Sequence, residues 1–215
     1  METQKGVRSS PLARGLFFYV QPVLNTLRVL GVVAALTMGF AARLGAQSAP
    51  VAPRPPEYRL RLYHLHTGES LDIVYRAGDA YLPGALAKLD YFLRDHRTGD
   101  VHHFDPRLYD VLEDLAKAAG YPTGEIDIVC GYRSPWSNEF LRRHTAGVAE
   151  HSLHVQAEAI DLRMPGVNTY KLRRAAVSLH RGGVGYYPGS DFIHVDIGRV
   201  RQWCLGCAMN GSSGD

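Results

Sequence analysis

Cysteine is scarce in this sequence, which limits the part that sulfur chemistry plays in it. The 215 residues include three cysteines, Cys130, Cys204 and Cys207. Cys204 and Cys207 form a lone Cys-x-x-Cys, and the two further ligands that a structural zinc site would need are not evident near it. In an exported protein this pair can form a disulfide, or one of the two can pair with Cys130.

Net charge is also nearly absent from most of the chain. The formal charge of +3 arises at the N-terminus, since residues 1–46 hold five basic residues and one acidic residue. The remainder has 19 basic and 20 acidic residues. A nucleic-acid-binding protein carries its positive charge in the folded part. The distribution therefore excludes that class.

A hydrophobic run long enough to be a typical membrane span is missing too. The run from Val29 to Ala42 is interrupted only by Thr37, and a spanning helix needs about 20 residues. Its length suits the core of a signal peptide, with a possible cleavage after Ala46. An uncleaved membrane anchor is the alternative. Both predict that the C-terminal part lies across the inner membrane.

The rest of the chain divides into a linker, a domain and a tail. Residues 47–57 contain four prolines without hydrophobic periodicity, which is typical of an extended linker. We expect a folded domain over 58–208 and a disordered tail over 209–215. Alternation predicts a hairpin over 58–75 and strands over 125–130, 184–187 and 192–197, and helical spacing predicts helices over 82–94, 105–120, 136–144 and 168–180. This mixture predicts an α+β domain with a small, mainly antiparallel sheet flanked by helices.

The chemistry concentrates between Ser152 and Asp196. His154, Asp161 and His194 are of the residue types that hold a catalytic zinc ion, with a fourth position left for water. Ile160 and Leu162 flank Asp161, so alternation directs the carboxylate away from the core, and His194 has the same setting. A turn must deliver His154. Each histidine alone is more often a surface or core residue, and it is the combination that favours a metal.

Arg133 stands where a strand ends and a helix begins, within Gly131-Tyr132-Arg133-Ser134. A guanidinium there can hold a carboxylate through two hydrogen bonds. The alternative is a structural arginine bonded to carbonyl groups. Among the other histidines, His64 and His66 are expected to be exposed strand residues.

Together these motifs resemble a known family. Gly131-Tyr132-Arg133-Ser134, Ser152-Leu-His154 with Asp161, Gly183-Val-Gly-Tyr-Tyr187 and His194-Val-Asp196 are similar to the zinc D-alanyl-D-alanine carboxypeptidase and endopeptidase family, in particular its murein endopeptidase K-like group of bacterial periplasms. The resemblance covers about residues 58–203. It implies a hedgehog/DD-peptidase fold, a Zn²⁺ cofactor, and a periplasmic protein that acts on peptidoglycan peptides.

The resemblance also implies roles for individual residues. His154, Asp161 and His194 match the zinc ligands, Arg133 the arginine that steadies the substrate, and Ser152 a substrate-contacting serine. Many members place a glutamate, the general base, three residues before the last histidine.

Asp191 occupies that place here and is one methylene shorter. In a regular strand Asp191 would face away from His194, whereas Asp196 shares its face and could hold the second ring nitrogen. The general base is therefore Asp191 or Asp196. Relatives also often have glycine where this chain has Ala157-Glu158.

The implied mechanism is zinc-assisted amide hydrolysis, in which zinc lowers the pKa of water, a carboxylate takes the proton and Arg133 stabilises the oxyanion. Two alternatives remain open at this point. One is a non-catalytic, zinc-containing module that binds the cell wall, and the other is a structural periplasmic protein with buried histidines. The membrane would be contacted only through an uncleaved N-terminal segment.

Overall fold

A computed structural model describes residues 53–145 and 147–207 of the chain. The expected signal peptide or anchor over 1–46 and the expected tail over 209–215 lie outside the described residues. Within the described ranges, no helix is long and apolar enough to cross a membrane.

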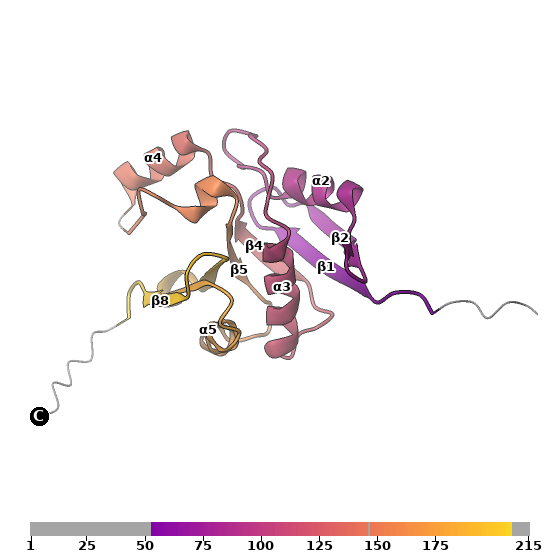
Figure 1. Ribbon diagram of the computed structural model, residues 1–215. Helices are drawn as coiled ribbons and strands as arrows, with labels where there is room; N and C mark the ends of the chain where they lie inside the picture. The colour runs from indigo at the N-terminus through magenta and orange to yellow at the C-terminus, as the bar shows by residue number, and fades with distance from the viewer. Residues whose placement is uncertain (1–52, 146, 208–215) are drawn as a thin grey trace, which may run out of the picture. The chain divides into compact units, whose positions relative to one another are not determined.

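The described part is built on one eight-stranded sheet (Figure 1). Its strands are β1 (Glu57–His64), β2 (Ser70–Ala77), β3 (Ala80–Tyr81), β4 (Ile126–Cys130), β5 (Ala159–Arg163), β6 (Gly183–Tyr187), β7 (Phe192–Asp196) and β8 (Arg201–Cys204). They are ordered β3-β2-β1-β4-β5-β7-β6-β8. The β1–β4 and β6–β8 pairs are parallel and the others antiparallel. The predicted α+β class with a mainly antiparallel sheet is confirmed.

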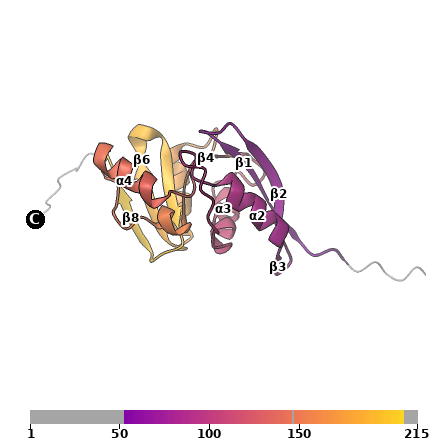
Figure 2. The same cartoon turned by 90° about the horizontal axis from the view of Figure 1, so that it is seen from above.

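In the described part of the chain, four α-helices accompany the sheet: α2 (Pro83–Phe92), α3 (Arg107–Ala118), α4 (Pro135–His144) and α5 (Thr169–Ser178). Helix α3 packs on β1, α5 packs on β6 and β7, and the two helices contact each other. Helices α2 and α4 lie at opposite ends of the domain in both views (Figures 1 and 2). One side of the central strands is thus covered by α3 and α5.

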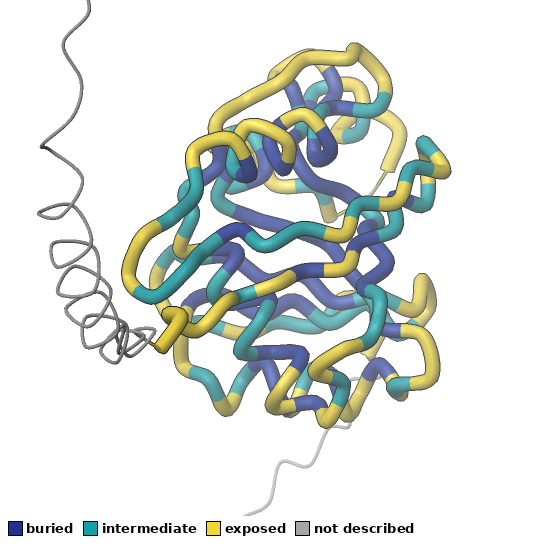
Figure 3. The backbone as a smooth tube through the Cα atoms, turned by 90° about the vertical axis from the view of Figure 1, so that its right-hand side faces the viewer, coloured by how far each residue is buried: buried dark blue, intermediate teal, exposed yellow. Residues whose placement is uncertain are grey.

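The hydrophobic core lies between the central strands and α3 and α5, where the buried residues gather (Figure 3). Helix α3 shows why it forms there. Leu108, Leu112 and Leu115 recur at helical spacing and are fully buried. Each contributes about 1.5–3 kcal/mol on burial. The strands β5 and β7 meet these helices with Ile160, Leu162 and their neighbours, which leaves the alternate positions for the opposite face.

Several local predictions need correction. Strand β8 was not expected, because Arg201–Cys204 is short and lacks a clear alternation. His64 is fully buried, not exposed, since it shares the apolar face of Leu60 and Leu62 in β1. In α4 the polar Ser137 and Asn138 take the buried face, whereas the apolar Phe140 is exposed and stacks on Trp136.

Candidate metal centre

The sheet places the centre of the site on the face opposite α3 and α5. Asp161 of β5 and His194 of β7 are direct cross-strand partners. Their neighbours Ile160, Leu162 and Val195 point into the core, so period-two alternation turns both polar side chains to the other side. The predicted juxtaposition of Asp161 and His194 on one face of the sheet follows from this register.

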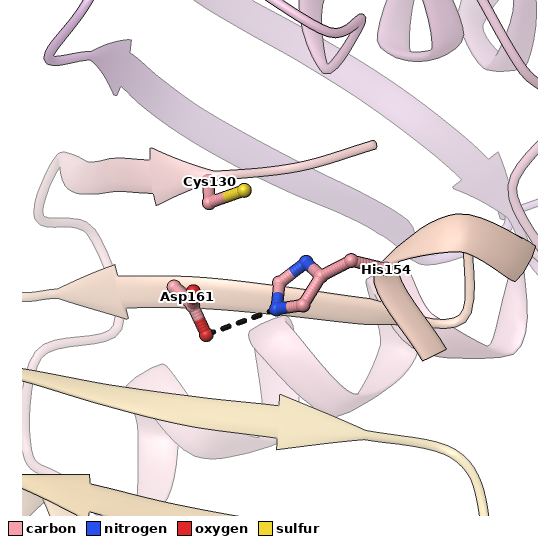
Figure 4. Close-up of side chains that lie close together, drawn as sticks. All are labelled: Cys130, His154 and Asp161. Atoms are coloured by element: carbon pink, nitrogen blue, oxygen red, sulfur yellow. Dashed lines mark hydrogen bonds and ion pairs between the residues drawn. The ribbon is translucent and has the colours of Figure 1, made fainter. Parts of the chain in front are cut away.

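A bulge in β4 adds a residue that sequence reasoning missed. The register passes from Ile128 opposite Leu162 to Cys130 opposite Asp161, so Val129 is the extra residue. Without the bulge, Cys130 would follow Ile126 and Ile128 into the core; with it, Cys130 joins the face of Asp161. Figure 4 shows the thiol beside His154 and Asp161. Strict alternation gave no signal for this change of face.

His154 reaches the site from a short 3₁₀ turn, Leu153–Gln156, as the odd spacing to Asp161 required. Ser152 caps this turn by accepting a hydrogen bond from the His154 N–H at 3.3 Å. Ala157 ends it with φ 54° and ψ 39°, a left-handed conformation that favours glycine. Ala157, which stands where relatives often have glycine, therefore lies at the position of this turn where glycine would relieve strain.

The three predicted ligands converge to a single point. His154 Nε2 lies 3.1 Å from Asp161 Oδ1 and 3.1 Å from His194 Nδ1. His194 Nδ1 lies 2.9 Å from Asp161 Oδ1. Tetrahedral zinc with bonds of about 2.0 Å separates its ligand atoms by roughly 3.3 Å. The donor types, their spacing and their burial therefore fit a zinc ion.

The outer nitrogen of each imidazole has its own acceptor, which leaves the inner nitrogen free to bind a metal. His154 Nδ1–H donates to the Gly131 carbonyl at 2.8 Å, and His194 Nε2–H donates to Asp196 at 3.1 Å. A Cβ on Gly131 would come within 2.5 Å of the Leu93 carbonyl oxygen, so only glycine allows this backbone position. These hydrogen bonds orient both rings, as is usual for metal-bound histidines.

The charges in the cluster are strongly coupled. Burial by itself lowers the pKa of His154, but the Asp161 carboxylate outweighs this effect and raises the pKa overall. Burial likewise opposes ionisation of Asp161, but His154 and His194 hold the pKa of that carboxyl well below its usual range. A proton shared between His154 and Asp161 thus compensates the negative charge of the buried carboxylate. A metal cation can replace that proton.

Cys130 offers a second donor set. Its thiol, His154 and Asp161 each present one potential ligand atom, and these atoms lie within 4.8 Å of one another. The His154–Asp161–His194 set is tighter, with all three separations at 3.1 Å or less. Cys130 remains unpaired, since Cys204 and Cys207 form the disulfide with each other. Of the two pairings left open above, the structure thus contains the local one.

Arg133 lies beside the cluster and is mostly buried. Its Nη2 is 3.5 Å from the Cys130 sulfur and 3.8 Å from Asp161 Oδ2, and its Nη1 donates to Asn138 at 3.4 Å. Its Nε is buried and has no hydrogen-bond partner among the described residues. A guanidinium with unused donors here can bind a carbonyl oxygen or a carboxylate.

The two candidate bases occupy different surroundings. Asp191 follows a 3₁₀ turn with φ 52°, and its carboxylate accepts a hydrogen bond from the Thr169 hydroxyl. Asp196 is buried behind His194, where it accepts from the N–H groups of Gly183 and Gly198 and pairs with Arg201. Burial raises the pKa of Asp196, but His194 and Arg201 outweigh it and lower the pKa overall. Asp196 adjoins the cluster and Asp191 does not.

A cavity of about 370 Å³ opens over the cluster. His154, Asp161 and His194 line it together with Arg133 and Ser152. Among the described residues that line it, Asp161 is the only carboxylate. The predicted ligands and both predicted substrate-contacting residues therefore share one cavity, whereas the side chains of Asp191 and Asp196 are not part of its wall.

Comparisons with known proteins find a matching family model and similar chains. A family model described as Peptidoglycan L,D-endopeptidase MepK, of the peptidase M15_2 type, matches residues 53–203. The chain is 43% identical over 171 residues to a probable peptidoglycan L,D-endopeptidase MepK of Haemophilus influenzae, covering 80% of this chain and 91% of that protein. It is 40% identical over 175 residues to peptidoglycan L,D-endopeptidase MepK of Escherichia coli K12, covering 78% and 94%. A Shigella flexneri protein of the same name has the same identity and coverage.

Proposed function

The chain belongs to the peptidoglycan L,D-endopeptidase MepK family, and we propose that it is a zinc-dependent peptidase that hydrolyses amide bonds in peptidoglycan peptides or cross-links. The observation that carries the proposal is the convergence of His154 Nε2, Asp161 Oδ1 and His194 Nδ1 within 3.1 Å at one wall of a cavity. The names of the relatives favour an L,D bond as the target. The mixed sheet with its buried ligands is consistent with the hedgehog/DD-peptidase fold.

We infer the following roles for the residues of the site. His154, Asp161 and His194 would hold Zn²⁺, which when bound polarises a carbonyl and lowers the pKa of water toward 7. Gly131 and Asp196 keep the two imidazoles in the tautomers that bind metal.

Arg133, which lines the cavity, would bind the substrate carbonyl oxygen or a nearby carboxylate through its guanidinium. Ser152 contributes mainly by capping the turn that carries His154, and it also borders the cavity.

The geometry favours different roles for the two carboxylates. Asp196 touches His194 and not the cavity, so we infer that it positions the ligand and is not itself the base. Asp191 is bonded to Thr169, and acting as the base would require breaking that bond. If Asp191→Asn retains turnover, the proton acceptor is an imidazole of the cavity wall, such as His151.

The test combines metal analysis with digestion. The purified full chain should contain one zinc per molecule and release soluble peptides from purified sacculi, identified by mass spectrometry. Chelation should stop the reaction and added zinc restore it. His154→Ala serves as the matched inactive control. A zinc-loaded wild-type protein that cleaves no muropeptide would contradict the proposal.

One observation favours a second candidate, a zinc-containing module that binds the cell wall without cleaving it. Asp161 is the only carboxylate among the described cavity residues, and as a metal ligand it is not available as a base. Binding of the zinc-loaded wild type to sacculi without product release would support this candidate.

We propose that the domain lies outside the cytoplasm, because peptidoglycan lies there and the apolar run over 29–42 would provide a means of export. A reporter enzyme that is active only in the periplasm, fused after Asp215, should be active. N-terminal sequencing of the mature chain distinguishes cleavage after Ala46 from retention as an anchor.

A further inference from the structure

A tyrosine hydroxyl lies on the wall of the same cavity and has no role in the scheme above. In the β6–β7 pair, Gly185 lies opposite His194 and Tyr187 lies opposite Phe192. Alternation therefore puts Tyr187 on the face of His194. Tyr187 is half-buried and lines the cavity together with Arg133 and the metal cluster.

Two contacts hold the Tyr187 ring in place. Its face stacks on Phe192, with ring centres 4.4 Å apart and planes 15° apart. Its oxygen accepts a hydrogen bond of 3.1 Å from the Trp203 Nε1–H. An indole N–H can only donate, so this bond uses the oxygen as an acceptor and leaves the hydroxyl proton free. Among the described residues, no acceptor for that proton is present.

Trp203 is itself positioned by the strand beside it. Its indole packs 5.1 Å from the His194 ring and 5.0 Å from the Arg201 guanidinium. It lies across Gly185, where a Cβ would approach the indole to 2.6 Å. The absent side chain at Gly185 is therefore what lets Trp203 reach the Tyr187 oxygen.

The hydroxyl is also kept protonated. Burial raises the pKa of Tyr187, and the charge of Asp161 adds to that effect, against the opposing hydrogen bond from Trp203 and the charge of Arg133. At neutral pH the group is thus a neutral donor beside the metal cluster.

We propose that Tyr187 is a catalytic residue whose hydroxyl donates a hydrogen bond to the scissile carbonyl oxygen, with Trp203 as its positioning residue. The proposal rests on the proposed peptidase function. During attack on an amide, the carbonyl oxygen gains negative charge, and a fixed donor stabilises that charge more than the ground state. The phenol keeps its proton throughout. Arg133 lines the same cavity, and Tyr187 supplies a second donor whose proton has no acceptor among the described residues.

The test compares Tyr187→Phe with Tyr186→Phe in the purified, zinc-loaded full chain. Tyr186 is the adjacent residue, its side chain is on the opposite face of β6 near Tyr170, and it serves as the matched control. Loss of one oxyanion donor typically lowers kcat about 10²–10³-fold. Tyr187→Phe should show that loss on cross-linked muropeptides, with KM changed only a few-fold and one zinc retained. Tyr186→Phe should keep wild-type kcat.

Two further measurements separate catalysis from structure. A phosphinic peptide that mimics the tetrahedral state should bind Tyr187→Phe more weakly by a similar factor, while affinity for the reaction product stays the same. Trp203→Phe, which keeps an aromatic ring without the N–H, should lose less kcat than Tyr187→Phe.

Unchanged kcat in Tyr187→Phe, or loss of its zinc, would overturn this inference while leaving the peptidase proposal intact. An inert wild type would overturn the proposed function, and this inference with it.

Discussion

Replacing Asp196 by Asn tests how the second histidine is held. The carboxylate accepts hydrogen bonds from His194 Nε2 at 3.1 Å, Gly183 N at 2.8 Å and Gly198 N at 2.9 Å, and pairs with Arg201 at 2.7 Å. Asparagine has nearly the same shape but lacks the negative charge. It also presents an amide N–H₂, which repels one of the donors that now surround the carboxylate.

The expected loss divides between metal affinity and folding. Removing the acceptor of a metal-bound histidine typically weakens binding about 10–100-fold, which corresponds to roughly 1.4–2.7 kcal/mol. Leaving buried donors without their charged acceptor costs about 1–3 kcal/mol of unfolding free energy. The Arg201 side chain is one-third exposed, so water can replace part of its interaction with Asp196. We therefore expect a loss of unfolding free energy in the lower half of that range. The melting temperature of the metal-free domain should fall by about 2–8 °C.

Zinc affinity is measured by competition with a chromophoric chelator, and turnover on muropeptides is followed with and without added zinc. Asp196→Asn should bind zinc more weakly and regain part of its activity at high zinc concentration. Asp191→Asn is the matched control, because Asp191 is bonded to Thr169 and lies outside the cavity wall. It should keep its zinc, and its turnover shows whether Asp191 is the proton acceptor. Full zinc affinity with abolished turnover in Asp196→Asn would refute the positioning role and make Asp196 the general base.

Three further predictions concern other parts of the domain. Cys130→Ser should retain one zinc by elemental analysis whereas His194→Ala should lose it, and the opposite result would make Cys130 the third ligand. Burial alone raises the pKa of Asp95, but hydrogen bonds from nearby serines lower it to about 2. Asp95→Asn should therefore cost about 2 kcal/mol of unfolding free energy at pH 7. In urea titrations this difference from the wild type should disappear as the pH falls from about 4 to 2. A difference that does not depend on pH would contradict the role of the Asp95 charge. Gly185→Ala should destabilise the domain by about 1–3 kcal/mol by displacing Trp203, while Gly189→Ala, with open space around it, should not.

The sequence by itself determined most of the framework and the three central residues. Alternation around Asp161 and His194 is a local property, so it predicted both their strands and the face on which they lie. The odd spacing to His154 predicted the turn that delivers it. Helix positions followed from the spacing of leucines such as those of α3, since a buried face needs apolar residues at that interval.

Tertiary structure decided what depends on pairing between distant segments. The bulge that turns Cys130 toward His154 exists only in the register of β4 against β5. Asp191 bonds Thr169, which lies 22 residues earlier and comes near only when α5 packs on the sheet. The role of Tyr187 depends on Trp203, on a strand that sequence reasoning did not predict. Such contacts join residues whose spacing along the chain carries no periodic signal, and only the folded sheet brings them together.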